Sequence, residues 1–154
     1  MKLAEALASR ADCQRRLSEL KQRILRNAKV QEGDVPSESP ESLLSEFQDR
    51  ADQLTNLIKR INKTNSQVPF KSGTLTDGLA ERDVLKLRHA CYQDLAEQAS
   101  ISQTRISRAE VRFKSAVDVS EIQRKADDYA KQYRELDSKI QEMNWSVDSL
   151  VWSA

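Results

Sequence analysis

The sequence has few of the residues that make tight turns, because only 3 of its 154 residues are glycine and 3 are proline. A β-sandwich or β-barrel needs a turn about every 8–12 residues, and turns depend heavily on these residue types. The scarcity therefore argues against an all-β architecture. Alanine, leucine, glutamate, lysine and arginine, which favour helices, are abundant instead. The composition predicts a mainly α protein with a single helical domain over residues 1–154.

Histidine and cysteine are scarce too. His89 is the only histidine, which excludes a di-iron bundle, because that bundle needs two Glu-x-x-His pairs. A single histidine without a ligand set or a nucleophile beside it gives neither a metal site nor a catalytic base, so we expect it at the surface or at a helix edge. Cys13 and Cys91 form no Cys-x-x-Cys motif. We therefore assign no catalytic residue, no metal and no cofactor.

Long apolar runs and a charge of one sign are also missing. No apolar stretch approaches the roughly 20 residues that a membrane-spanning helix needs. The first ten residues are amphipathic, include Glu5 and lack the apolar core of a signal peptide. The 25 basic and 24 acidic residues give a net charge of +1, unlike a dedicated nucleic-acid binder. Together with the two lone thiols, these features predict a cytoplasmic protein with no membrane span and no clear nucleic-acid partner.

Hydrophobic periodicity predicts four helices. They cover about residues 2–27, 40–63, 76–99 and 119–146. The second helix begins with Ser39 as N-cap and Pro40 at the first helical position, where a missing N–H costs nothing. The fourth begins at Asp118, which forms an Asp-x-x-Glu capping box with Glu121.

Apolar residues follow three- and four-residue spacings along these helices, as in coiled coils. The seam of the second helix is Leu44, Phe47, Ala51, Leu54, Ile58 and Ile61. The seam of the fourth is Val119, Ile122, Ala126, Tyr129, Tyr133, Leu136, Ile140, Met143, Val147 and Leu150. The third helix has a half-turn-wide apolar arc, which predicts packing on two neighbours; it comprises Ala80, Val84, Leu85, Leu87, Cys91, Tyr92, Leu95, Ala96 and Ala99. We predict an elongated four-helix domain of long antiparallel hairpins with coiled-coil-like seams.

The segments between the helices leave room for a small two- or three-stranded β element. Residues 111–117 alternate in polarity at their start and are β-branched at both ends, so we predict a short strand there. Residues 29–31 are its expected partner. Residues 68–70 are a further edge-strand fragment, because proline is tolerated at a sheet edge.

A polar patch interrupts the apolar faces where the second helix ends and the third begins. Asn62 and Asn65 continue the apolar stripe of the second helix, while Asp77, Glu81 and Arg88 fall within the arc of the third. The patch comprises Asn62, Asn65, Thr74, Thr76, Asp77, Glu81 and Arg88. Buried charges need partners, so the patch is either a capping and register-setting network or a small pocket for a polar or metal ligand. Gly78 lies beside it, which indicates a close approach of another backbone or a ligand, or a frayed helix start.

A second, basic cluster surrounds the predicted strand. It consists of Arg105, Arg108, Arg112 and Lys114, with hydroxyl side chains interleaved and Phe113 nearby. Such a cluster can bind phosphate or RNA, but one aromatic residue gives a weak signal. The alternative is pairing with the acidic residues between positions 32 and 49.

Three stretches carry a resemblance to a known family. They are residues 27–33 (Asn-Ala-Lys-Val-Gln-Glu-Gly), residues 61–65 (Ile-Asn-Lys-Thr-Asn) together with 74–83, and residues 133–145. The chain resembles the bacterial septicolysin-labelled family of uncharacterised small helical proteins over nearly its whole length. The resemblance implies a helical, prokaryotic protein and supplies no catalytic residues. The label suggests a cytolysin, but the sequence shows no export signal and no membrane-length apolar segment.

Three functions follow from these observations. The first is a non-enzymatic protein that forms a homo-oligomer through its helical seams. The second is a small-molecule or metal-binding protein, with an enzyme included in that class, that uses the polar patch. The third is the cytolysin-type toxin that the family label suggests.

Overall fold

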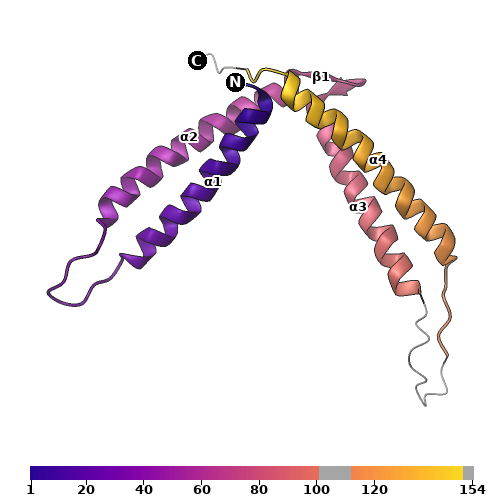
Figure 1. Cartoon of the computed structure of the whole chain (residues 1–154), viewed down its shortest axis with the longest axis horizontal. Helices are drawn as coiled ribbons and strands as arrows, with labels where there is room; N and C mark the ends of the chain where they lie inside the picture. Colours follow the sequence, from indigo (N-terminus) through magenta and orange to yellow (C-terminus); the bar gives the residue numbers. More distant parts are fainter. Residues whose placement is uncertain (101–111, 151–154) are drawn as a thin grey trace. The chain divides into compact units, whose positions relative to one another are not determined.

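The computed structural model describes residues 1–100 and 112–150 and confirms a mainly α fold with four helices and a small sheet (Figure 1). The elements are α1 (Leu3–Arg26), α2 (Pro40–Gln67), β1 (Pro69–Phe70), β2 (Gly73–Thr74), α3 (Leu75–Ala99) and α4 (Val119–Ser146). The chain divides into two compact units, with residues 69–141 in the second and the remaining residues in the first. The single domain stays a prediction.

The predicted helix starts are confirmed by their caps. Ser39 accepts a hydrogen bond from the Ser42 backbone N–H at 3.3 Å, and Asp118 accepts one from the Glu121 N–H at 3.2 Å. Both bonds satisfy N–H groups that have no partner within the first turn of a helix. Local chemistry therefore sets where α2 and α4 begin.

The first unit is built on the hairpin of α1 and α2, which lie side by side (Figure 1). Leu3, Leu20 and Ile61 are buried in its core. At the end of the hairpin where the loop joins α1 to α2, Arg23 forms an ion pair with Glu38, and Asn27 accepts a hydrogen bond from the Glu38 N–H at 3.1 Å. The second-helix seam faces inward except at its start, where Leu43 is buried in place of the predicted Leu44.

The second unit pairs α3 with α4 in antiparallel directions. The side chains of Gln93 and Gln123 are hydrogen-bonded near one end, and Arg82 donates to Asp137 at 3.0 Å near the other. Between them, the rings of Tyr92 and Tyr129 lie 5.2 Å apart in a tilted arrangement. The predicted seam of α4 is confirmed, because each of its residues is buried or half-buried.

The predicted β element was right at residues 68–70 and wrong at the other two segments. The sheet joins β1 to β2 in antiparallel register, with Phe70 opposite Gly73. Residues 112–117 and 29–31 form no strand, while residue 111 lies outside the described part of the chain. Residues 68–70 include a real strand, so the edge-fragment prediction located one half of the sheet. The other strand, β2, was not predicted, because a two-residue strand is too short to show periodicity.

The predicted inner face of α3 was also partly wrong. Leu85, Tyr92, Ala96 and Ala99 are half-buried or buried, as expected. The other apolar positions of the arc are exposed: Ala80, Val84, Leu87, Cys91 and Leu95. Arg82 and His89 occupy half-buried positions near the inner face instead. We call the five exposed residues the α3 stripe.

Candidate functional site

The predicted polar patch begins with a helix cap. Asp77 accepts hydrogen bonds from the Thr74 N–H at 2.8 Å and the Thr74 hydroxyl at 3.2 Å. Together these residues form the capping box of α3. A side chain placed at Gly73 would collide with the Asp77 carboxylate. The geometry therefore gives Asp77 and Thr74 a structural role at the start of α3.

Gly78 is buried because an aromatic ring covers it. A Cβ atom at this position would lie 2.5 Å from two ring carbons of Phe70, which belongs to β1. Phe70 is itself buried, with 8% of its surface exposed. The sequence suggested another backbone, a ligand or a frayed helix start at Gly78, but the group that approaches it is the Phe70 side chain, which packs the small sheet on the first turn of α3.

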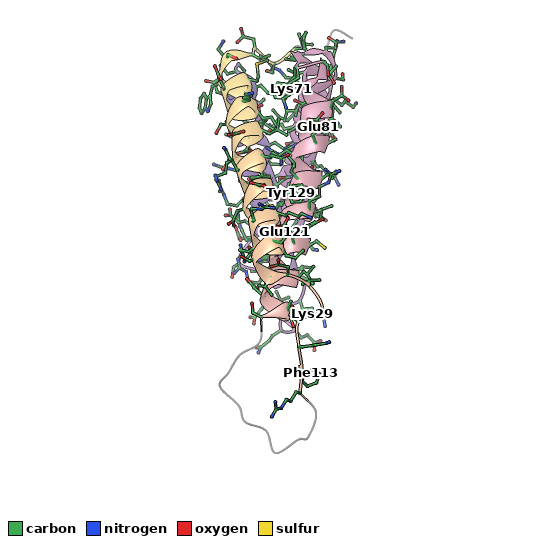
Figure 2. All side chains as sticks on the ribbon, turned by 90° about the vertical axis from the view of Figure 1, so that its right-hand side faces the viewer. Lys29, Lys71, Glu81, Phe113, Glu121 and Tyr129 are labelled. Atoms are coloured by element: carbon green, nitrogen blue, oxygen red, sulfur yellow. The ribbon has the colours of Figure 1, made fainter. Side chains whose placement is uncertain are left out.

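The turn between the two strands brings Lys71 to α3. Lys71 has a φ of 51°, a left-handed conformation that costs about 1 kcal/mol or more for a residue other than glycine. Its ammonium nitrogen lies 3.8 Å from a carboxylate oxygen of Glu81, and Figure 2 shows both residues on this part of the second unit. Both side chains are about half exposed, so the ion pair adds little to stability.

A groove of about 590 Å³ runs beside this ion pair, between α3 and α4. Its floor is apolar and its rim carries charges of both signs. The lining residues are Lys71, Ala80, Glu81, Val84, Leu85, Arg88, Gln132, Glu135, Leu136 and Lys139. The volume lies within the roughly 300–1,000 Å³ of small-molecule sites. Of the predicted patch, the groove includes Glu81 and Arg88.

The remaining patch residues are divided between the units. Asn62 is exposed and Asn65 half-buried, and both lie on α2 in the first unit. Thr76 is exposed on α3 in the second. A convergence of the two asparagines with Asp77, Glu81 and Arg88 stays a prediction.

The predicted basic cluster is only partly described. Arg105 and Arg108 lie outside the described residues, while Arg112 and Lys114 are exposed. Anion binding by this cluster stays a prediction. Over residues 1–100 and 112–150, no three histidine, cysteine, aspartate or glutamate side chains gather in a way that could hold a metal ion. In the same residues, no helix is long and apolar enough to cross a membrane.

The α3 stripe was missed as a surface because its spacing resembles that of a core face. Leu87 is 70% exposed, Val84 44% and Leu95 38%. Scattered exposed apolar residues are normal on soluble proteins, but these follow one another at three- and four-residue spacings along one helix. The stripe adjoins the groove, because Ala80 and Val84 belong to both.

A buried contact between the chain ends was also missed. The fully buried Thr64 hydroxyl donates to the Arg60 carbonyl at 2.8 Å and accepts the Leu150 N–H at 2.9 Å. Ser149 donates through its backbone and its hydroxyl to the Met1 carbonyl. The available signal was that Thr64 lies three residues beyond Ile61 and so continues the inner face of α2.

Comparison with known proteins finds relatives whose function is unknown. It is 45% identical to a functionally unknown conserved protein from Corynebacterium diphtheriae, whose crystal structure superposes with a TM-score of 0.92. The alignment covers 97% of this chain and 99% of that one. No curated protein matches the chain, and neither finding carries the septicolysin label. A family of unknown function, DUF6847, matches residues 10–149, and the chain therefore belongs to that family.

Proposed function

We propose that this protein is a non-enzymatic interaction protein that self-associates through its helices. The α3 stripe is the observation that carries the proposal. Burying apolar area contributes about 25 cal/mol per Å², so an exposed apolar helix face favours covering by a partner. A second copy supplies such a partner without any further component, and symmetric homo-oligomers are common among soluble proteins.

The surface available for self-association is smaller than the sequence alone suggested. The seam of α4 and most of the seam of α2 are buried or half-buried within the two units. An oligomer that used those seams would have to open the hairpins and lose their packing. An oligomer that used the α3 stripe would keep the packing of both hairpins, because the apolar side chains of the stripe are already exposed.

Light scattering coupled to gel filtration tests the proposal on the full chain. We expect a mass above that of the monomer, which is 17.6 kDa, and a rise in that mass with concentration. A mass equal to the monomer across roughly micromolar to millimolar concentrations would contradict self-association.

A second candidate function uses the groove between α3 and α4. Its apolar floor and charged rim fit a small amphipathic ligand, and Arg88 is an exposed rim residue that can bind an anionic group. A thermal-shift screen with metals and nucleotides tests it, because a ligand of the folded state raises the unfolding midpoint. A screen without any shift would oppose it. The cytolysin hypothesis has its own test, the leakage of liposomes at micromolar protein.

A further inference from the structure

We propose that the partner on the α3 stripe is a second copy of the same helix, packed antiparallel with Val84 opposite Leu87 of that copy. This inference rests on the proposed self-association and adds its orientation and register. It follows from the positions of charged residues beside the stripe.

The stripe can be written as coiled-coil positions. Val84 and Cys91 then occupy a positions, Ala80 and Leu87 occupy d positions, and the next residue after each d position is an e position. The e positions beside the central layers are Glu81 and Arg88. In an antiparallel pair, a residues face d residues and e residues face e residues across the interface.

The proposed register pairs opposite charges twice. When Val84 faces Leu87 of the second copy, Ala80 faces Cys91, and Glu81 faces Arg88. Twofold symmetry repeats each contact, because each copy supplies the same surface. Two ion pairs then flank the two central layers. These layers consist of Val84 and Leu87, which are 44% and 70% exposed in the single chain.

Charge also rejects the neighbouring antiparallel registers. A shift of one heptad toward the C-terminal end of α3 brings Leu87 opposite Cys91 and sets Arg88 against Arg88 of the second copy. A shift in the other direction brings Ala80 opposite Val84 and sets Glu81 against Glu81. Like charges directly opposed across an interface are unfavourable, and this repulsion fixes register in helical pairs.

Asp94 meets an aspartate of the second copy in either orientation, and the two orientations differ in where that contact lies. In a parallel pair, Asp94 would face Asp94 of the second copy between the Cys91 and Leu95 positions, inside the seam. In the antiparallel pair, Asp94 faces Asp77 in the first turn of α3, beyond the Ala80 layer. The opposed helix dipoles favour the antiparallel pair as well.

Charge reversal on the full chain tests the register. We expect Arg88→Glu to weaken the dimer about tenfold or more, because it sets two pairs of like charges face to face. Glu81→Arg combined with Arg88→Glu should return the dissociation constant to within about threefold of the original, because the two pairs re-form with exchanged signs. The two residues are seven apart on one helix, so they do not form a neighbouring pair within one chain. Failure of the double variant to recover would overturn the register.

An apolar position provides the matched control. Leu87→Asp should weaken the dimer by at least about 30-fold, since Leu87 lies at the centre of the proposed interface. Leu25→Asp makes the same change at a leucine of α1 that is 63% exposed, and it should leave the mass unchanged. Circular dichroism checks that both variants stay folded. A dimer that persists in Leu87→Asp would overturn this interface while leaving self-association intact, whereas a monomeric wild type would defeat both.

Cross-linking distinguishes the two orientations. Ala80→Cys with the native Cys91 kept should yield a covalent dimer under a thiol oxidant, because position 80 faces Cys91 of the second copy in the antiparallel pair. Ala80→Cys combined with Cys91→Ala should not, because the two positions 80 then lie toward opposite ends of the interface. Cys13 is buried and does not interfere. In wild type, Cys91 faces Ala80 of the second copy, so no disulfide is expected. Efficient Cys91–Cys91 cross-linking of the wild type would show a parallel pair and overturn the proposal.

Discussion

At the scale of the residue, Gly78 shows why a glycine can be required inside a helix although it lowers helix stability. Glycine inside a helix costs about 1 kcal/mol relative to alanine. Here that cost is offset because the Phe70 ring lies where a Cβ atom would be. The glycine is therefore a packing partner of the small sheet.

We expect Gly78→Ala to destabilise the fold by about 1–3 kcal/mol, because the added methyl displaces the Phe70 ring. In a Phe70→Ala background the same substitution should stabilise, because the ring is gone and only the helix propensity remains. Urea unfolding followed by circular dichroism measures both changes. An equal effect of Gly78→Ala in the two backgrounds would show that the ring contact carries no energy.

The ionisation of Glu38, in the loop between α1 and α2, makes the stability of the fold depend on pH. The hydrogen bond and charge of Arg23 hold the pKa of Glu38 below its ordinary value. A carboxyl group with a lowered pKa stabilises the fold above its unfolded pKa, near 4.3, and loses that contribution as the pH falls through the lower folded value. We expect Glu38→Gln to flatten part of the stability loss between about pH 5 and pH 3.

Thermal midpoints across that pH range measure the effect. Glu32→Gln, in the same loop, controls for the removal of one negative charge. A Glu38→Gln profile that runs parallel to the wild type down to about pH 3 would exclude the Arg23 pair as a source of pH dependence.

At the scale of the element, the sequence was sufficient to predict where the helices lie. It was insufficient to predict which face of α3 packs on its neighbour. The α2 and α4 starts follow from local caps, and the α4 seam follows from one clear period. The inner face of α3 could not be assigned the same way, because two apolar faces share that helix and periodicity does not say which one meets α4. The half-buried Arg82 at the inner side is paired with Asp137, a partner 55 residues away that local patterns cannot reveal.

In the candidate site, too, local sequence predicted some features and the fold decided the others. The sequence singled out Asp77 and Glu81 as polar residues near apolar positions, and their partners in the structure are Thr74 and Lys71. A strand turn brings Lys71 to Glu81, and no spacing rule predicts that contact. The α3 stripe was visible in the sequence as a pattern, but its exposure depends on which face α4 occupies.

At the scale of the whole molecule, contacts of high sequence separation join the two ends of the chain. Lys2 pairs with Asp148 at 3.1 Å, and the Leu3 N–H donates to the Val147 carbonyl at 2.9 Å. Thr64 adds α2 to this set through its bond from the Leu150 N–H. These contacts hold the segment after α4 against α1 and α2 within the first unit, so we expect their loss to lower the stability of more than one helix.

Thr64→Val tests this connection, because valine has the same shape without the hydroxyl. We expect a loss of about 1–3 kcal/mol in the free energy of unfolding, since the Leu150 N–H is left without its acceptor. Thr55→Val is the matched control: Thr55 lies on the same helix and donates to the carbonyl four residues earlier at 3.0 Å, but it is exposed. It should change stability by about 0.5 kcal/mol or less. Thr64→Ser keeps the hydroxyl and should recover part of the loss, whereas equal effects at positions 64 and 55 would mean that the hydroxyl acts only within α2.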